Sequence, residues 1–201
     1  MTELLDVPAI TRGLPSVPPP ELDPYLDAGA RCLARHGVSR TSVADVAREM
    51  GISRATVYRQ VGTIDQLAVL LFAREVHRLL EALPEQVTGL SGVDAVIRMA
   101  TLVTQFAREH PVLRKVLDDE PEIAGSHLVL GLPAVLDRVR PVVVPLLAAG
   151  IATGQLADRD PDVLLDWLVR LVTSVVLVPP PGEVGSYFDD VLRPVLTPAR
   201  A

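Results

Sequence analysis

Hydroxyl and guanidinium side chains gather between residues 53 and 59 of this 201-residue chain, at Ser53, Arg54, Thr56, Tyr58 and Arg59. An arginine side chain offers five N–H donors, and a hydroxyl group both donates and accepts hydrogen bonds. Arginine also donates in pairs to phosphate oxygens and to the major-groove edge of guanine. The segment therefore predicts a surface that recognises anionic groups and base edges.

Two short helices joined by a tight turn are expected to position these side chains. Ser42 and Asp45 form a capping box, so a helix begins there. Ser53 can cap a second helix. Between them, glycine suits the turn because it adopts left-handed dihedrals at little cost. Such a pair of helices needs a small residue where the helices touch, a glycine in the turn, and an aliphatic residue that packs the second helix. These positions are held by Ala47, Gly51 and Val57, respectively. This spacing predicts a helix-turn-helix that binds duplex DNA.

The local charge agrees with a DNA partner. Residues 28–61 hold six arginines and two acids, a net charge of +4, whereas the formal net charge of the whole chain is -6. A basic face on one module is the footprint that matters for nucleic acid, even in an acidic chain. The competing interpretation is an ordinary helical hairpin with solvated arginines, which requires spacing, caps and charge to coincide by accident.

The stretch GVSRTSVADVAREMGISRATVYRQVGTIDQL resembles the N-terminal DNA-binding domain of TetR-type transcriptional regulators. The matching residues are Gly37, Thr41, Val43, Ala47, Gly51, Ser53, Thr56, Tyr58 and Leu67. Two positions depart from the family pattern: Val61 stands where phenylalanine is usual, and Ile64 stands where a lysine usually contacts phosphate. The resemblance implies a DNA-binding regulator that has lost one backbone contact. An alternative is a TetR-like small-molecule binding protein that has lost DNA binding.

The predicted DNA contact divides into base-reading and backbone-binding residues. The major groove is assigned to Ser53, Arg54, Ala55, Thr56 and Arg59. The backbone is assigned to Tyr58 and Thr41, with Arg40 on the flanking phosphates and Ser42 in the same surface, because a helix N-terminus attracts phosphate. One short recognition helix reads few base pairs, so a homodimer on a palindromic operator is expected.

The whole chain predicts an all-α protein, because no segment sustains a period-two alternation. Three regions are expected: a disordered Pro-rich tail over 1–20, a helix-turn-helix DNA-binding domain over 21–66, and a helical ligand-binding and dimerisation domain over 67–201. The expected helices after residue 60 run from the Thr63–Gln66 capping box to about Leu83, then over Val93–His110, Pro111–Asp118, a stretch from Leu128 bent or interrupted by Pro133, Pro141 and Pro145, Asp162–Val178 and Tyr187–Val195.

The last two predicted helices carry more apolar residues than one buried face needs, which favours a partner helix pair. The resemblance also places dimerisation there. The predicted dimer residues are Leu164, Leu168, Leu171, Val172, Val175, Phe188, Val191, Leu192 and Val195. Full burial of these residues within one chain is the alternative.

A small apolar effector is the expected second partner. The resemblance implies that such a ligand releases the regulator from DNA, so that it acts as a repressor. Ligand sites in helical proteins are mostly apolar. The candidate ligand-binding residues are Met99, Leu102, Val103, Phe106 and Trp167, each of which could equally be ordinary core.

Other function classes find little support in the sequence. Cys32 and His36 share a helix face, but no third group orients them as a catalytic pair needs. Histidines on adjacent turns are absent, so we expect no metal, and we expect no other cofactor. The single cysteine excludes an intrachain disulfide. With no signal peptide and no apolar run long enough to span a membrane, the sequence predicts a cytoplasmic protein rather than a membrane protein. Because Cys32 and His36 lack a third orienting group, it also predicts that the protein is not an enzyme.

Overall fold

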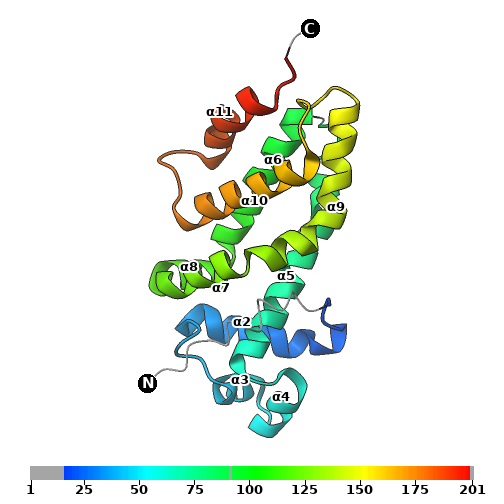
Figure 1. Cartoon of the computed structure of the whole chain (residues 1–201). Coiled ribbons are helices and arrows are strands. Elements are labelled where there is room, and N and C mark those ends of the chain that lie inside the picture. The colour runs from blue at the N-terminus through cyan, green and yellow to red at the C-terminus, as the bar shows by residue number, and fades with distance from the viewer. Residues whose placement is uncertain (1–15, 91, 200–201) are drawn as a thin grey trace. The chain divides into compact units, whose positions relative to one another are not determined.

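The computed structural model of the chain describes residues 16–90 and 92–199, and every regular element in these ranges is a helix (Figure 1). The all-α fold class is therefore confirmed. Most of the predicted N-terminal tail, residues 1–15, lies outside the described residues. Within the described ranges, no helix combines the length and the apolar character that crossing a membrane requires.

One short 3-10 helix, η1, and ten α-helices follow one another in these ranges. Their bounds are η1 Pro20–Leu22, α2 Asp23–His36, α3 Val43–Met50, α4 Arg54–Val61, α5 Ile64–Gln86, α6 Gly92–Glu109, α7 Pro111–Asp119, α8 Pro121–Leu130, α9 Leu132–Ala152, α10 Pro161–Leu177 and α11 Val184–Leu196.

Short-range hydrogen bonds explain where several helices begin. The Thr63 Oγ1 accepts the Gln66 N–H at 3.2 Å, and the Gln66 Oε1 accepts the Thr63 N–H at 2.8 Å, which confirms the predicted capping box at the start of α5. The Asp160 carboxylate accepts the N–H groups of Asp162 and Val163 at 2.8 and 3.2 Å and so caps α10. These contacts satisfy amides that have no partner inside their own helix.

Prolines interrupt the helices less than the sequence predicts. The expected end of α5 before Pro84 is wrong, since the helix continues to Gln86. Both Pro141 and Pro145 lie inside α9, which bends but does not break (Figure 1). Proline removes one helical hydrogen bond and crowds the preceding turn, and bending relieves that crowding.

The chain between Asp118 and Val139 also differs from the prediction. The sequence predicts no helix between Asp118 and Leu128, but Pro121 opens a separate helix, α8, and α9 starts only after Gly131. Proline is well suited to the first turn of a helix, because its φ is already helical and it lacks an N–H that would be unpaired there.

Two compact units divide the structure. The head unit holds residues 16–78 and 109–134, so it contains α7 and α8 as well as the expected helix-turn-helix. Its core includes the fully buried side chains of Leu26, Leu33, Val46, Val57 and Leu67. The predicted boundary at residue 66 separates a DNA-binding from a ligand-binding region, whereas the two units are defined by how the chain packs. The predicted boundary therefore stays a prediction.

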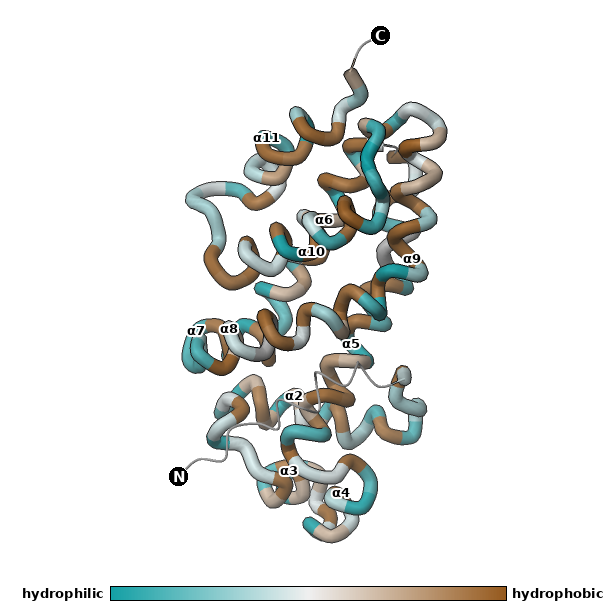
Figure 2. Tube along the Cα trace, viewed as in Figure 1, coloured by the Kyte–Doolittle hydropathy of each residue, from teal (hydrophilic) through white to brown (hydrophobic). Residues whose placement is uncertain are grey.

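The second unit holds residues 79–108 and 135–199. Its helices are joined by polar contacts as well as by apolar packing. The Arg108 guanidinium donates to the Val176 carbonyl at 2.8 Å, and the Ala157 N–H donates to the Leu196 carbonyl at 2.8 Å. Apolar residues recur along α9, α10 and α11 (Figure 2), and the most deeply buried include Leu147, Leu165, Phe188, Leu192 and Leu196.

Candidate nucleic-acid interface

The turn between α3 and α4 has the geometry that the sequence predicts. Gly51 adopts left-handed dihedrals (φ 69°, ψ 27°) and closes α3, while the Ile52 N–H donates back to the Ala47 carbonyl at 3.0 Å. Val46 on α3 and Val57 on α4 are fully buried and lock the two helices together. The arrangement is a helix-turn-helix.

The face of α4 opposite its buried residues is exposed and polar. Val57 and Val61 point into the head unit, whereas Tyr58 is 56% exposed. The other exposed residues at this helix are Ser53, Arg54, Ala55, Arg59 and Gln60, and Thr56 is half-buried. All the base-reading residues predicted on α4 therefore lie on or beside one accessible surface. The predicted set omits Gln60, which is also exposed on α4. Its polar side chain, outside the buried positions of the helix, could have indicated from the sequence that it belongs to the same surface.

Ser53 and Thr56 fix the N-terminus of α4. The Ser53 Oγ accepts the Thr56 N–H at 3.1 Å, and the two hydroxyl oxygens lie 2.8 Å apart. One hydroxyl hydrogen is used between them, so the pair offers one free hydroxyl hydrogen to an outside acceptor. The cap holds α4 in place and leaves its polar face available.

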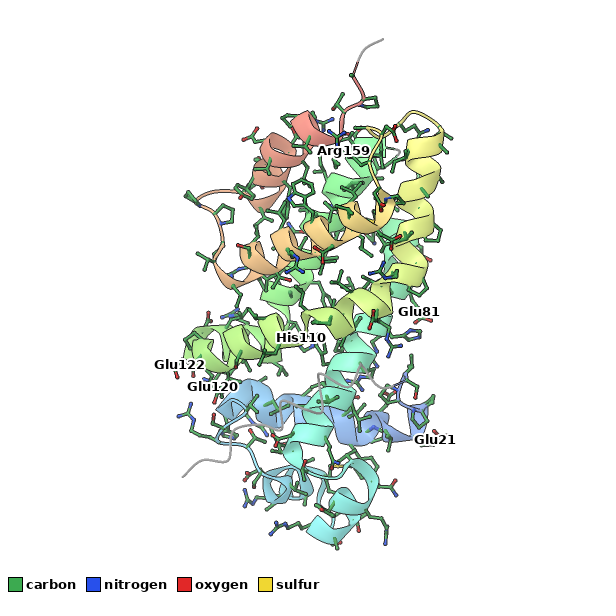
Figure 3. All side chains as sticks on the ribbon, in the orientation of Figure 1. Glu21, Glu81, His110, Glu120, Glu122 and Arg159 are labelled. Carbon is green, nitrogen blue, oxygen red and sulfur yellow. The ribbon has the colours of Figure 1, made fainter. Side chains whose placement is uncertain are left out.

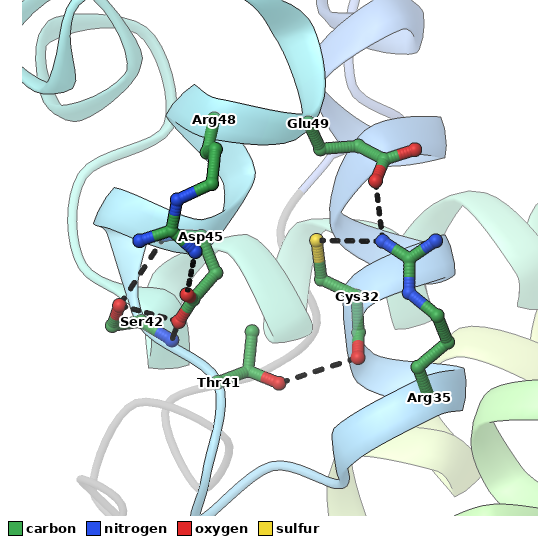
Figure 4. Close-up of polar contacts among 7 residues, drawn as sticks. All are labelled: Cys32, Arg35, Thr41, Ser42, Asp45, Arg48 and Glu49. Carbon is green, nitrogen blue, oxygen red and sulfur yellow. Dashed lines mark hydrogen bonds and ion pairs between the residues drawn. The ribbon is translucent and has the colours of Figure 1, made fainter.

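A second cap fixes α3. The Ser42 N–H donates to the Asp45 carboxylate at 2.9 Å, and the Ser42 hydroxyl donates to the same carboxylate at 2.6 Å (Figure 4). The Arg48 guanidinium donates to Asp45 at 2.8 Å. The hydrogen bonds from Ser42, followed by the contact with Arg48, hold the pKa of Asp45 below its ordinary value. The predicted capping box is confirmed, and it also engages Arg48.

Glu49 engages two more of the arginines counted in the basic window. Arg31 donates to the Glu49 carboxylate at 2.8 Å. Arg35 donates to the other oxygen of the same carboxylate (Figure 4). The hydrogen bonds from these two guanidinium groups lower the pKa of Glu49. Because Arg31 and Arg35 lie on α2 while Glu49 lies on α3, the three side chains tie the two helices together. These arginines contribute less free positive charge than their number suggests.

The three remaining arginines of the basic window, Arg40, Arg54 and Arg59, differ in their acidic neighbours. Arg40 lies 3.6 Å from the Asp119 carboxylate. By contrast, in residues 16–90 and 92–199 neither Arg54 nor Arg59 forms an ion pair. An exposed guanidinium without a neighbouring acid keeps its full charge and its donors for an outside anion. Of the six arginines in the basic window, the two without an acidic partner among the described residues are therefore those of α4.

The predicted phosphate contact of Thr41 needs a correction. Its side chain is only 6% exposed, and its hydroxyl donates to the Gly37 carbonyl at 2.6 Å, with the Cys32 carbonyl at 3.4 Å. A hydroxyl has a single hydrogen, and here the Gly37 carbonyl takes it. Thr41 thus pins the loop between α2 and α3, while Ser42 beside it is exposed.

Cys32 is likewise a structural residue. Its side chain is buried, and burial raises the pKa of the thiol although Arg35 donates to its sulfur at 3.8 Å. A thiol of raised pKa is a poor nucleophile, because the thiolate is the reactive form. The geometry gives no support to a catalytic pair with His36.

The predicted ligand and dimer residues lie in the second unit. The candidate ligand-binding residues Met99, Leu102, Val103, Phe106 and Trp167 are all half-buried. Of the predicted dimer residues, five are buried within the chain: Leu164, Leu168, Val175, Phe188 and Leu192. For these five the alternative of burial within one chain describes the structure. The remaining four, Leu171, Val172, Val191 and Val195, are half-buried or exposed and stay candidates.

Comparison with known sequences finds similarity to bacterial transcriptional regulators. Residues 26–70 match the family model described as bacterial regulatory proteins, tetR family. The HTH-type transcriptional regulator Mb1846 of Mycobacterium bovis is 30% identical over 139 residues, which is 67% of this chain and 59% of that protein. The chain thus spans less than two thirds of the length of this relative. The uncharacterized HTH-type transcriptional regulator Rv1255c of Mycobacterium tuberculosis is 25% identical and covers 89% of this chain and 87% of its own.

Solved structures share the fold at low sequence identity. The fatty acid degradation regulator FadR of Bacillus halodurans superposes with a TM-score of 0.63 at 20% identity, covering 88% of this chain and 94% of its own. FadR of Bacillus subtilis, solved in complex with stearoyl-CoA, superposes with a TM-score of 0.59 at 17% identity, covering 85% and 95%. With the helix-turn-helix geometry and the matches in sequence, the conclusion is that this chain belongs to the TetR family of bacterial regulatory proteins.

Proposed function

We propose that this chain is a sequence-specific DNA-binding transcriptional regulator that reads operator DNA with α4. One observation carries the proposal: α4 presents Arg54, Tyr58 and Arg59 on an exposed face, and its two arginines meet no acid within the described residues. A helix lying in the major groove uses such donors on guanine and on phosphates. The buried Val57 and Val61 keep that face turned outward.

The proposed regulator acts as a homodimer on a palindromic operator, because two copies of α4 are needed to read a site of useful length. Exposed apolar residues on the last two helices support a partner surface in the second unit. Val163 is 67% exposed and Val195 is 42% exposed. Together with the half-buried Leu171, Val172 and Val191, they are the residues through which we expect the two copies to meet.

The proposed mode of control is repression relieved by a small apolar effector in the second unit. Met99, Leu102, Val103 and Phe106 on α6 are half-buried apolar residues of the kind that line such ligand sites. A protein of the same fold, FadR of Bacillus subtilis, was solved with stearoyl-CoA. A ligand relieves repression only if it binds better to the arrangement that binds DNA less well.

Ile64 favours a second candidate, a TetR-like small-molecule binding protein without DNA binding. It stands at the start of α5, half-buried, where the family resemblance implies a lysine on phosphate. Loss of one backbone contact weakens binding without removing the base-reading face, so we retain DNA binding as the main proposal.

A gel-shift experiment separates the two candidates. Purified protein is titrated against DNA from immediately upstream of its own gene, with unlabelled specific and unrelated duplexes as competitors. Arg54→Ala should weaken specific binding by about 1–3 kcal/mol and relax the base preference. Arg159→Ala, a matched loss of one exposed arginine outside the helix-turn-helix, should leave both unchanged.

Two results would count against the regulator. Absence of specific retardation by the wild-type protein on every upstream fragment would favour the ligand-binding candidate. Retardation with identical affinity and base preference in wild type and Arg54→Ala would remove Arg54 from the reading surface.

A further inference from the structure

The carboxylate of Glu120 binds two consecutive backbone amides in the loop that precedes α3. Its Oε2 accepts the Val38 N–H at 2.8 Å, and its Oε1 accepts the Ser39 N–H at 3.0 Å. Glu120 itself lies at the corner between α7 and α8 (Figure 3). Its backbone carbonyl also accepts the Ile123 and Ala124 N–H groups of α8 at 2.9 and 3.0 Å. A charged acceptor makes these hydrogen bonds stronger than neutral ones. We refer to this contact as the Glu120 anchor.

The anchored loop controls where α3 begins. It runs from Gly37, which ends α2, to Ser42, which caps α3, and Val38 within it is buried. The hydrogen bond at the Val38 amide is partly buried, and the one at the Ser39 amide is exposed. A partly buried amide that loses its acceptor regains water only in part, which costs free energy. The loop therefore depends on a side chain that is 82 residues away in sequence from Val38.

The backbone of the loop is shaped to receive the carboxylate. Gly37 has φ 78°, in the region that glycine favours, and a Cβ atom at this position would lie 3.0 Å from the Glu120 carboxylate. Glycine thus provides both the turn at the end of α2 and the space for the acid. The fit on both sides indicates a built contact rather than a chance approach of an exposed glutamate.

A neighbouring ion pair reinforces the same junction more weakly. Arg40 of the loop lies 3.6 Å from Asp119, which also pairs with Lys115. Arg40 is 68% exposed, and exposed ion pairs contribute little to stability. The Glu120 anchor, with two well-placed hydrogen bonds, is the main polar link between this corner and the loop.

The course of the chain gives the anchor a further consequence. Residues 109–134 belong to the head unit, yet the chain enters them from α6 and leaves them into α9, both of which lie mainly in the second unit. Glu120 stands in the middle of that insertion. A displacement of either connecting helix would therefore act on Glu120 through the covalent chain.

We propose that Glu120 is a positioning residue for DNA binding: it touches no DNA, but it holds the loop that sets α3 and, through the turn, α4. The proposal rests on the proposed function. Without the anchor, the head unit still folds around its apolar core, but α3 and α4 are no longer held in a single arrangement. Specific binding should then suffer more than non-specific binding, because base contacts need closer positioning than phosphate contacts.

Two measurements test the proposal, and the first needs no DNA. Amide hydrogen exchange of the full chain is followed residue by residue in wild type, Glu120→Gln, Glu120→Asp and Glu122→Gln. Glutamine keeps the length but presents an NH₂ group to one of the two amides, and aspartate keeps the charge but is one methylene shorter. Glu122→Gln is the matched control, because it removes the same charge from an exposed position two residues away (Figure 3).

Exchange at Val38 and Ser39 should accelerate by about tenfold or more in both Glu120 variants, a change equivalent to at least about 1.4 kcal/mol, and should not change in Glu122→Gln. The second measurement is the affinity of each variant for the upstream DNA fragment that the wild type retards in the gel shift, and for an unrelated duplex. We expect a loss of about tenfold in the ratio of the two affinities for Glu120→Gln, at a temperature where circular dichroism shows the variant folded.

Each other outcome decides a different point. Unchanged exchange at both amides would overturn the anchor itself. Faster exchange with an unchanged affinity ratio would overturn its role in positioning. If the wild type binds no DNA specifically while both amides still exchange faster in the Glu120 variants, the proposed function fails and the role in DNA binding falls with it, whereas the anchor of the loop stands.

Discussion

Gly29, in the middle of α2, offers a sharp test of how closely α2 and α5 pack in the head unit. A Cβ atom built on Gly29 would lie 2.5 Å from the Cδ2 and 2.9 Å from the Cδ1 of Leu67. Leu67 is fully buried, so its methyl groups cannot swing into solvent to make room. Gly29→Ala therefore forces a shift of Leu67 or of a helix.

Two opposing terms set the magnitude. Replacing glycine by alanine inside a helix contributes about 0.8–1.0 kcal/mol of stability. Overpacking a well-packed core costs about 1–3 kcal/mol. We expect Gly29→Ala to lower the free energy of unfolding by about 1 kcal/mol. Gly125→Ala is the matched control: Gly125 also lies in a helix of the head unit, but a Cβ there meets nothing within 4 Å, so we expect a gain of about 0.5–1 kcal/mol.

Urea unfolding followed by circular dichroism measures both changes, provided the m-value stays constant. In a Leu67→Ala background, where the clashing methyl groups are gone, Gly29→Ala should become neutral or stabilising. The coupling between the two sites then equals the overpacking term, about 1–3 kcal/mol. Additive effects of the two substitutions, or a Gly29→Ala variant as stable as Gly125→Ala, would refute the close approach of α2 and α5.

Three further predictions concern charge. The Arg74 side chain is buried and donates to Asp23, Asp27 and Glu75 at 2.8–3.0 Å. Arg74→Met should therefore lower the free energy of unfolding, measured by urea titration, by about 1–3 kcal/mol. This cost is smaller than that of breaking a fully buried ion pair, because Asp23 and Asp27 are accessible to water. Hydrogen bonds lower the pKa of Asp45, so its contribution to stability is present above its ordinary pKa of 3.8 and is lost as the pH falls through the lower folded pKa. Asp45→Asn should flatten the acid limb of the stability profile measured from pH 5 to pH 2, and an unchanged limb would contradict this. Ile64→Lys should tighten DNA binding and steepen the slope of log K against log[salt] by about 1.8 for a dimer, about 0.9 for each added phosphate contact; a salt-independent wild type would remove the premise.

Contacts between residues close together in the sequence specify the helix-turn-helix and its caps. Ser42 with Asp45, Ser53 with Thr56, and Thr63 with Gln66 are contacts between residues three positions apart, and Gly51 turns the chain by its own dihedrals. Such interactions depend on residue type and spacing alone. For the same reason Val57 could be assigned to the buried side of α4 from the sequence. The structure adds Val61 to that side, which leaves Arg54, Tyr58 and Arg59 on the outside.

Which polar and small side chains contact other parts of the protein, and which face solvent, follows only from the packing of whole helices. Thr41 turns inward to Gly37, Glu49 engages the arginines of α2, and five of the predicted dimer residues are buried within the chain. Gly29 meets Leu67, and Glu120 reaches Val38 across 82 positions of sequence. These contacts join residues whose distance in space is set by how whole helices pack. A local pattern contains no information on that packing, because the same arginine or threonine serves equally well facing water or facing a partner on another helix.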